Sequence, residues 1–214
     1  KSRSAAQMAE AIRIIDSARA AGIDITADQY PYIASGTGLS AMLNTWVQEG
    51  GSDSLVARLH DSTVRVRLKK ELAEDSAAGI RTAANTMVNS VTVDSLKKYQ
   101  GKRLPEIAQM MGGGRDGYDA AFDILMNDRG RTSAIYFSFN EDALRMVMKK
   151  PWVSVGQDAG AVSPDSLGRW GERGHPRGFG TFPRILGRYV RQDSVITLEF
   201  AVRKMTSLAA QRVG

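Results

Sequence analysis

The feature that most limits the fold of this sequence is a helix that runs through a glycine into a short apolar strand. Residues 4–21 carry apolar side chains at steps of three and four, which predicts an amphipathic helix with Ser4 as its N-cap. Gly22 follows at the position where a left-handed residue ends a helix. Residues 23–28 then read as a strand that continues to Gln29 and stops before the prolyl loop. A chain of this pattern is the αβ half of an α/β unit.

The same order recurs near the end of the chain. Asn140 is expected to cap a helix that turns Leu144 and Met148 inward, and residues 152–158 form a second apolar strand. Two helix–strand repeats with polar residues where each strand ends predict a parallel α/β layer. In such folds, whether barrel or open sheet, ligand sites lie at the carboxyl ends of the strands.

Composition excludes several classes of protein. The chain has 214 residues, 43% apolar and 24% charged, which suits one large or two small globular domains. No apolar run approaches the ~20 residues of a membrane helix. There is no cysteine, and the only histidines are His60 and His175. A zinc site built mostly from histidine therefore cannot be completed within these residues.

The middle of the chain does not continue the helix–strand repeat. We expect a short helix over 39–49, a charged helical stretch over 53–75 and a Val- and Thr-rich strand over 86–93. The predicted buried stripe of the helical stretch is Leu55, Leu59, Val66 and Leu72. Residues 39–103 are interpreted as a small α+β insertion between two segments of one layer, 1–38 and 104–214. Further helices are expected over 104–111, 118–127, 179–191 and 197–211, and a strand over 134–139.

Three positions are candidates for chemistry. Asp158 ends an apolar strand, where a carboxylate is costly to bury unless it binds a metal ion or is fully hydrogen-bonded; the alternative is that it caps the next loop. Tyr30, in Tyr30-Pro31-Tyr32, either plugs the strand end or donates a phenolic hydrogen bond to a substrate, with Ser35 close by. His175 is either structural or a ligand. The glycine stretches at 36–38 and 112–114 lack the other residues of phosphate-binding loops.

The net charge of +6 is concentrated in one run. One interpretation is a surface for nucleic acid or another acidic partner, which would make the chain a basic non-catalytic module. The other is a solvated helix face, because several of the arginines are three or four residues apart. The run consists of Arg169, Arg173, Arg177, Arg184, Arg188 and Arg191.

Three blocks in this order resemble the D-aminoacylase (N-acyl-D-amino-acid deacylase) branch of the amidohydrolase superfamily. The first is Ala27-Asp28-Gln29-Tyr30-Pro31-Tyr32 with Ser35 and Thr37-Gly38-Leu39. The second is Gly156-Gln157-Asp158-Ala159-Gly160. The third runs from His175 through Pro176-Arg177-Gly178-Phe179-Gly180-Thr181-Phe182-Pro183-Arg184 to Arg191. The resemblance covers most of the chain and is weakest over 40–103.

The resemblance implies the C-terminal portion of a metal-dependent hydrolase (β/α)8 TIM-type barrel with a small inserted α+β domain. It implies zinc as the cofactor, with Asp158 as metal ligand and as the base that moves a proton from the attacking water to the leaving nitrogen. Tyr30 and Ser35 would contact the substrate, and Arg177 would be a nearby cationic group. Tyr136 and Phe139 match the wall of the side-chain pocket. Catalysis by Asp158 requires that its carboxylate face a cavity and not be neutralised by a guanidinium.

The sequence also lacks some residues of the family's metal site, and their absence leads to further predictions. The family's His-x-His and its other histidine ligands precede the segment that matches Lys1, so we expect this chain to be part of a longer protein and not to hold zinc or be active alone. The expected substrate is an N-acyl-D-amino acid, with no nucleic acid or membrane as partner. A dihydroorotase- or hydantoinase-like enzyme is an alternative. Uncovered strand edges also predict self-association of the truncated barrel.

Overall fold

A computed structural model describes residues 4–77, 82–160 and 175–214. Arg169 and Arg173 of the predicted basic run lie outside these residues. The described chain forms two compact units: the first comprises 4–33, 139–160 and 175–214, and the second 34–77 and 82–138. Over the described ranges, no helix has both the length and the apolar character needed to cross a membrane.

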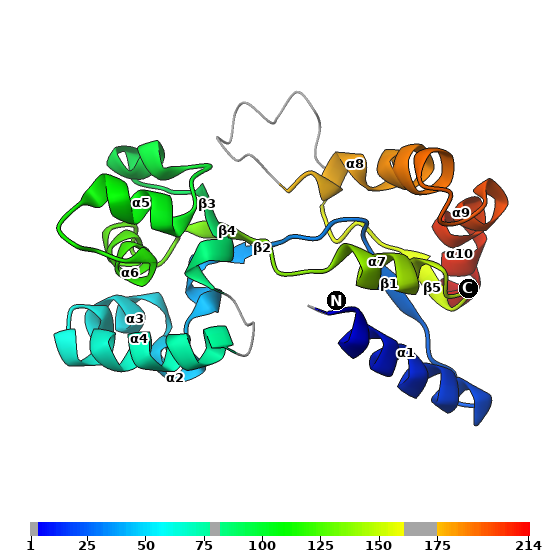
Figure 1. Ribbon diagram of the computed structural model, residues 1–214, viewed down its shortest axis with the longest axis horizontal. Helices are drawn as coiled ribbons and strands as arrows, with labels where there is room; N and C mark the ends of the chain where they lie inside the picture. The colour runs from blue at the N-terminus through cyan, green and yellow to red at the C-terminus, as the bar shows by residue number, and fades with distance from the viewer. Residues whose placement is uncertain (1–3, 78–81, 161–174) are drawn as a thin grey trace. The chain divides into compact units, whose positions relative to one another are not determined.

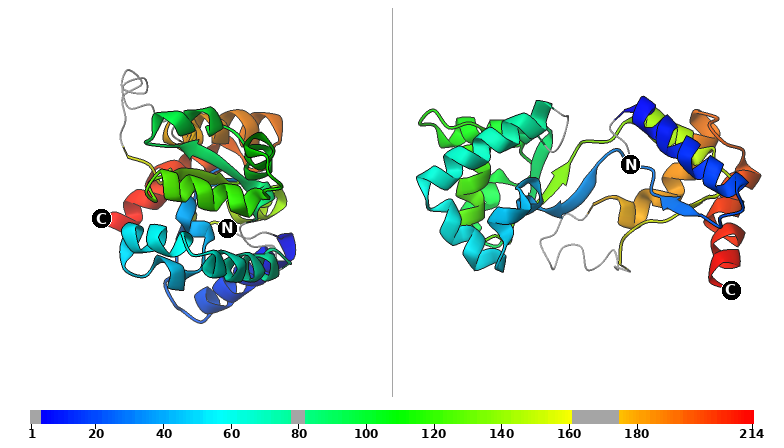
Figure 2. Two further views of the ribbon diagram at one scale, coloured as in Figure 1. Left: turned by 90° about the vertical axis from the view of Figure 1, so that its left-hand side faces the viewer. Right: turned by 90° about the horizontal axis from the view of Figure 1, so that it is seen from below.

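The first unit is built on a pair of parallel strands, as the two helix–strand repeats predict. In strand β1 (Ala27–Gln29), Ala27 pairs with Val153 of β5 (Val153–Val155). Helix α1 packs on α7, and α9 packs on β5 (Figures 1 and 2). The helical elements of this unit are α1 (Ala5–Ala20), α7 (Glu141–Met148), α8 (Arg177–Arg184), the π-helix η5 (Ile185–Gln192), α9 (Leu198–Met205) and α10 (Ser207–Val213).

Local signals set the ends of α1, but the strand after it is shorter than predicted. The Ser4 hydroxyl accepts the amide N–H of Gln7, and Gly22 has a φ of 87°, so both predicted caps are confirmed. Ile23 is 56% exposed, and Asp24 forms an ion pair with Arg212 of the C-terminal helix. Residues 23–26 are therefore a surface connection, and pairing begins only at Ala27.

The later helices follow the predicted order with two changes. The Asn140 side chain caps α7 as predicted, accepting the Ala143 N–H at 3.0 Å. The helix expected over 179–191 begins as α8 and widens into the π-helix η5. The helix expected over 197–211 is broken at Thr206, whose φ of −132° and ψ of −92° separate α9 from α10.

The second unit combines a three-stranded antiparallel sheet with helices. Its strands are β2 (Ser35–Gly38), β3 (Thr86–Ser90) and β4 (Ser133–Tyr136), in the order β2-β4-β3. Its helices are α2 (Thr45–Gln48), α3 (Gly51–Leu59), α4 (Ser62–Ala77), α5 (Leu104–Met111) and α6 (Gly117–Asn127), with the 3-10 helices η1 (Leu39–Met42), η2 (Ala83–Asn85) and η3 (Asp94–Tyr99).

Because of strand β4, the second unit ends later in the chain than the predicted insertion does. The strand over 134–139 is predicted to belong to the segment 104–214, but β4 lies between β2 and β3, with Tyr136 opposite both Ser35 and Thr86. The compact unit consequently extends to Ser138, beyond the predicted insertion of 39–103. Long-range strand pairing sets the end of the second unit, so no local residue pattern predicts it.

Two details within the second unit correct the sequence prediction. The charged stretch over 53–75 is two helices, and the break between them changes the phase of the buried stripe. Val66 is therefore 70% exposed, while Leu68 is fully buried in its place. The strand expected over 86–93 ends at Ser90, beside a register irregularity against β4.

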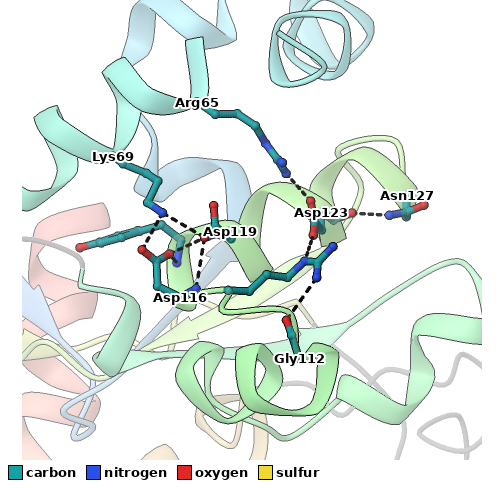
Figure 3. A network of polar contacts seen from close by, with 9 residues as sticks. Arg65, Lys69, Gly112, Asp116, Asp119, Asp123 and Asn127 are labelled. Carbon is teal, nitrogen blue, oxygen red and sulfur yellow. Dashed lines mark hydrogen bonds and ion pairs between the residues drawn. The ribbon is translucent and has the colours of Figure 1, made fainter. Parts of the chain in front are cut away.

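Charged side chains connect α4 with α6 (Figure 3). Lys69 Nζ lies 2.7 Å from an oxygen of Asp116 and 2.9 Å from one of Asp119. The Asp123 carboxylate accepts from Arg65 and, at 2.9 Å, from Arg115 Nε. These contacts fix the packing of two helices that are about 50 residues apart in the chain.

Candidate functional site

In the first unit, the Tyr-Pro-Tyr segment after β1 meets the start of α8. The Arg177 guanidinium lies over the Tyr30 ring, 4.9 Å from its centroid. The His175 ring packs edge-on against both Tyr30 and Tyr32, with centroid separations of 5.7 and 5.2 Å. Residues about 145 positions apart in sequence are thus brought together at the carboxyl end of β1.

Asp158 joins this group, but its surroundings differ from those of a metal ligand. One carboxylate oxygen lies 3.1 Å from an Arg177 guanidinium nitrogen, and the Asp158 side chain is 69% exposed. The backbone at Asp158 has a φ of 50°, in the left-handed region that costs energy for a residue other than glycine. The carboxylate is therefore neutralised by a guanidinium in this structure, and the condition for its role as catalytic base is not met here.

Burial raises the pKa of the Tyr30 phenol, and the Asp158 carboxylate adds to the rise. Arg177 acts in the opposite direction, through its charge and a hydrogen bond, but does not cancel the effect of burial. A tyrosine phenol is protonated at neutral pH, and the raised pKa leaves the Tyr30 phenol in that form. Tyr30 can then donate a hydrogen bond to a ligand oxygen, which is the role predicted for it.

His175 has a structural position. Its Nδ1 accepts the backbone N–H of Arg177 at 3.1 Å, and its ring lies against the two tyrosines. An Nδ1 that accepts this bond cannot also offer its lone pair to a metal ion, and in the neutral ring Nε2 then carries the proton, so this tautomer does not bind a metal ion. The geometry therefore favours the structural interpretation of this histidine.

Ser35 and Tyr136 belong to the second unit, where they face each other across β2 and β4. Tyr136 is 1% exposed, and its hydroxyl donates to the carbonyls of Gly38 and Leu39 at 2.8 and 3.1 Å. These contacts hold Tyr136 in the core of the second unit, and its expected role in the wall of a side-chain pocket stays a prediction. The strand that carries Tyr136 was expected in the segment 104–214, whereas β4 pairs with β2 and β3 of the second unit.

Phe139 lines a mostly apolar cavity of about 220 Å³ in the first unit. Tyr32, Asp28 and Gln29 of the β1 segment also line it, so Phe139 lies beside the segment that carries Tyr30. The other lining residues are Met8, Ala11, Ile12, Ile15, Ala27, Asn140, Ala143, Leu144, Val147 and Trp152. Neither Arg177 nor Asp158 lines this cavity.

The described residues do not fit a zinc site on their own. Within 4–77, 82–160 and 175–214, no three side chains of the metal-binding types are grouped to share an ion. Asp158 offers a single carboxylate, already paired with a cation. Structural and catalytic zinc sites need at least three protein ligands.

Sequence reasoning missed the part of this site made by Tyr32, Gly180 and Arg184. The Arg184 Nε donates to the Pro31 carbonyl at 2.8 Å, and its guanidinium lies 5.1 Å from the centre of the Tyr32 ring. Gly180 lies directly beneath the Tyr32 hydroxyl. The available signal was a glycine inside a predicted helix, which helix propensity alone disfavours.

Comparison with curated proteins gives three significant relatives, although no protein-family profile matches the chain. N-acyl-D-glutamate deacylase of Alcaligenes xylosoxydans xylosoxydans is 30% identical over 200 residues, which are 94% of this chain and 30% of the relative. D-aminoacylase of the same organism is 35% identical over 117 residues, 55% of this chain and 21% of the relative. The resemblance to the D-aminoacylase branch is confirmed.

Solved structures agree in fold. An N-acyl-D-glutamate deacylase from Bordetella bronchiseptica, complexed with zinc and a phosphonate inhibitor, matches with a TM-score of 0.59 and 27% identity over 94% of this chain and 31% of that one. A D-aminoacylase described by its binuclear metal centre matches with a TM-score of 0.63 and 26% identity over 96% and 32%. The chain thus has a mixed α/β fold and spans about a third of the length of the deacylases it matches.

Proposed function

We propose that the protein containing this chain is a zinc-dependent hydrolase that removes the acyl group from N-acyl-D-amino acids. The alignment with N-acyl-D-glutamate deacylase over 94% of the chain carries this proposal. The meeting of Tyr30, Arg177 and Asp158 at the carboxyl end of β1 supports it, because ligand sites of parallel α/β folds lie at that edge. The chain would be the C-terminal part of the (β/α)8 barrel, with residues 34–138 inserted.

The roles of the chain's own residues follow from their charges. Arg177 would pair with the carboxylate of the substrate, and Tyr30 would donate to its amide or carboxylate oxygen. Since one guanidinium holds Asp158 in this structure, an incoming carboxylate would compete for Arg177 and free Asp158. Asp158 would then accept a proton from the attacking water and return it to the leaving nitrogen.

Zinc is proposed from the relatives and not from the described residues, which do not form a site for it. Its remaining ligands would come from elsewhere in the protein, and when bound it would make the attacking water acidic enough to react near neutrality. We therefore expect the 214-residue chain alone to be inactive. Ser35 as a substrate contact, and Tyr136 and Phe139 as the wall of the side-chain pocket, stay predictions.

Three of the four described arginines of the basic run are engaged within the first unit, which argues against the alternative of a basic module, and Arg191 is the exposed member. Among the described arginines of the run, Arg177 and Arg188 pair with carboxylates and Arg184 donates to the Pro31 carbonyl. These guanidiniums are used inside the first unit, whereas a nucleic-acid surface presents them to phosphates.

The test is made on the complete protein. We expect zinc by elemental analysis and acetate release from N-acetyl-D-amino acids, with kcat lowered about 10²- to 10⁴-fold in Asp158→Ala, the range for loss of a general base. Asp142→Asn, which changes an exposed carboxylate in the first turn of α7, is the matched control. Turnover by Asp158→Ala close to that of wild type would end the catalytic assignment.

A further inference from the structure

The phenol of Tyr32 lies against the backbone of α8, at a point that the proposed function does not use. A Cβ added at Gly180 would lie 2.2 Å from the Tyr32 hydroxyl oxygen, so either the phenol or α8 would have to shift. The hydroxyl also makes a long hydrogen bond of 3.4 Å to the Pro176 carbonyl, and the ring meets His175 edge-on. One side chain thus contacts the start of α8 at three points.

Arg184 holds the same segment from the other end of α8. Its Nε donates to the Pro31 carbonyl at 2.8 Å, and its guanidinium covers the Tyr32 ring. Arg177 and Arg184 are seven residues apart, or about two helical turns, so they project from one face of the helix. One guanidinium lies over Tyr30 and the other over Tyr32.

We infer that Tyr32 is a positioning residue. Its hydroxyl, seated on Gly180, fixes where α8 lies along the end of β1 and so brings Arg177 to Tyr30 and Asp158. His175 and Arg184 hold the Tyr32 ring, so we expect a side chain at position 180 to displace α8 and not the phenol. The inference rests on the proposed function only in taking Arg177 as the group that binds the substrate carboxylate.

The test uses a reciprocal pair of substitutions in the complete protein. Gly180→Ala should raise KM for an N-acetyl-D-amino acid about tenfold with kcat within about threefold, as expected for a misplaced binding group. Adding Tyr32→Phe removes the clashing oxygen and leaves the ring Cζ 3.6 Å from the new methyl group, an ordinary contact. The double variant should therefore return KM to within about twofold of Tyr32→Phe alone.

Gly178→Ala is the matched control. It makes the same change in the same helix, but its Cβ would meet only Ala159 Cβ, at 3.7 Å. We expect KM, kcat and thermal stability close to those of wild type, because the gain in helix propensity is small. Gly180→Ala behaving like Gly178→Ala would overturn the inference, as would a double variant no better than Gly180→Ala.

A readout independent of turnover separates this inference from the proposed function. The Arg177 side chain is only 14% exposed, so it should react slowly with phenylglyoxal, as measured by peptide mass mapping. Gly180→Ala should speed that reaction severalfold, and the double variant should restore the slow rate. If the wild-type protein hydrolyses no N-acyl-D-amino acid, the proposed function fails, while this rate still tests whether Tyr32 positions Arg177. An unchanged rate in Gly180→Ala would refute the positioning role.

Discussion

Two fully buried charged side chains are stabilised in opposite ways. The Asp128 carboxylate accepts from Thr92, Val93 and Thr132 at 2.6 to 3.0 Å, so its oxygens have several donors. Lys204 is 1% exposed, and no carboxylate of the described residues forms an ion pair with it; its Nζ donates to the backbone carbonyls of Lys150 and, at 2.7 Å, Val153. Carbonyl dipoles replace water only partly around an ammonium group, so this burial is costly.

The free energy of unfolding should therefore depend on pH through Lys204. Burial, followed by the charge of Arg203, lowers the pKa of Lys204 from 10.5 to about 8. Between pH 8 and 10.5 the unfolded chain binds more protons than the folded one, so stability rises with pH across that window. Relative to Lys204→Met, the wild-type free energy of unfolding should increase by about 2 kcal/mol from pH 7.5 to 9.5.

Urea titrations at these two pH values measure that difference, and Lys149→Met, at an exposed lysine, controls for the loss of a positive charge. If wild type and Lys204→Met changed equally with pH, the ammonium group would not be the buried, destabilised cation described.

At the scale of single elements, α6 shows how a helix start and a tertiary contact share one residue. Asp116 accepts the N–H groups of Tyr118 and Asp119, both at 2.9 Å, and the Asp119 side chain accepts the Asp116 N–H in return. The same Asp116 carboxylate pairs with Lys69 of α4 (Figure 3). A local capping signal and a long-range ion pair thus converge on one carboxylate.

Two substitutions separate these contributions. Asp116→Ala should lower the free energy of unfolding by about 1 to 2 kcal/mol, since it removes both the cap and the ion pair. Asp116→Asn keeps a capping oxygen and should cost about 0.5 kcal/mol, mainly through Lys69. Urea unfolding at pH 7 measures both. Equal losses in the two variants would show that the cap contributes nothing.

At the scale of the whole molecule, the second unit contains a closed core. All the buried residues of its main cluster lie between Leu39 and Tyr136, and its three strands pair only with one another. The backbone N–H of Phe139 donates to the Ile33 carbonyl at 3.1 Å, so the two connections to this unit run side by side. A segment of about 105 residues with adjacent ends and its own core meets the usual conditions for an autonomous domain.

We therefore expect residues 34–138 to fold when expressed alone, with a helical circular-dichroism spectrum and one cooperative urea transition. The first unit should not do so, because its described sheet is two strands of three residues each. A non-cooperative or unfolded 34–138 segment would contradict the division into two units.

Sequence reasoning was most accurate where the signal is local. Helix α5 has the predicted ends, Leu104 and Met111, and the caps at Ser4 and Asn140 are confirmed. It failed where the outcome depends on distant partners. The predicted burial of Val66 was wrong because a break after α3 changed the helical phase, and the strand over 133–136 was expected in the other unit because its pairing partners are distant in sequence.

The order of residues alone determined that a helix–strand repeat would give a parallel pair, and that the motifs around Tyr30, Asp158 and Arg177 resemble those of D-aminoacylases. Caps, periodicity and motif order depend on residues that are close in sequence, so they can be predicted from the sequence alone. Only the tertiary structure decided that Arg177 pairs with Asp158 and that the phenol of Tyr32 rests on Gly180. Such contacts depend on how β1 and α8 meet across some 145 residues, and packing, not local sequence, sets that distance.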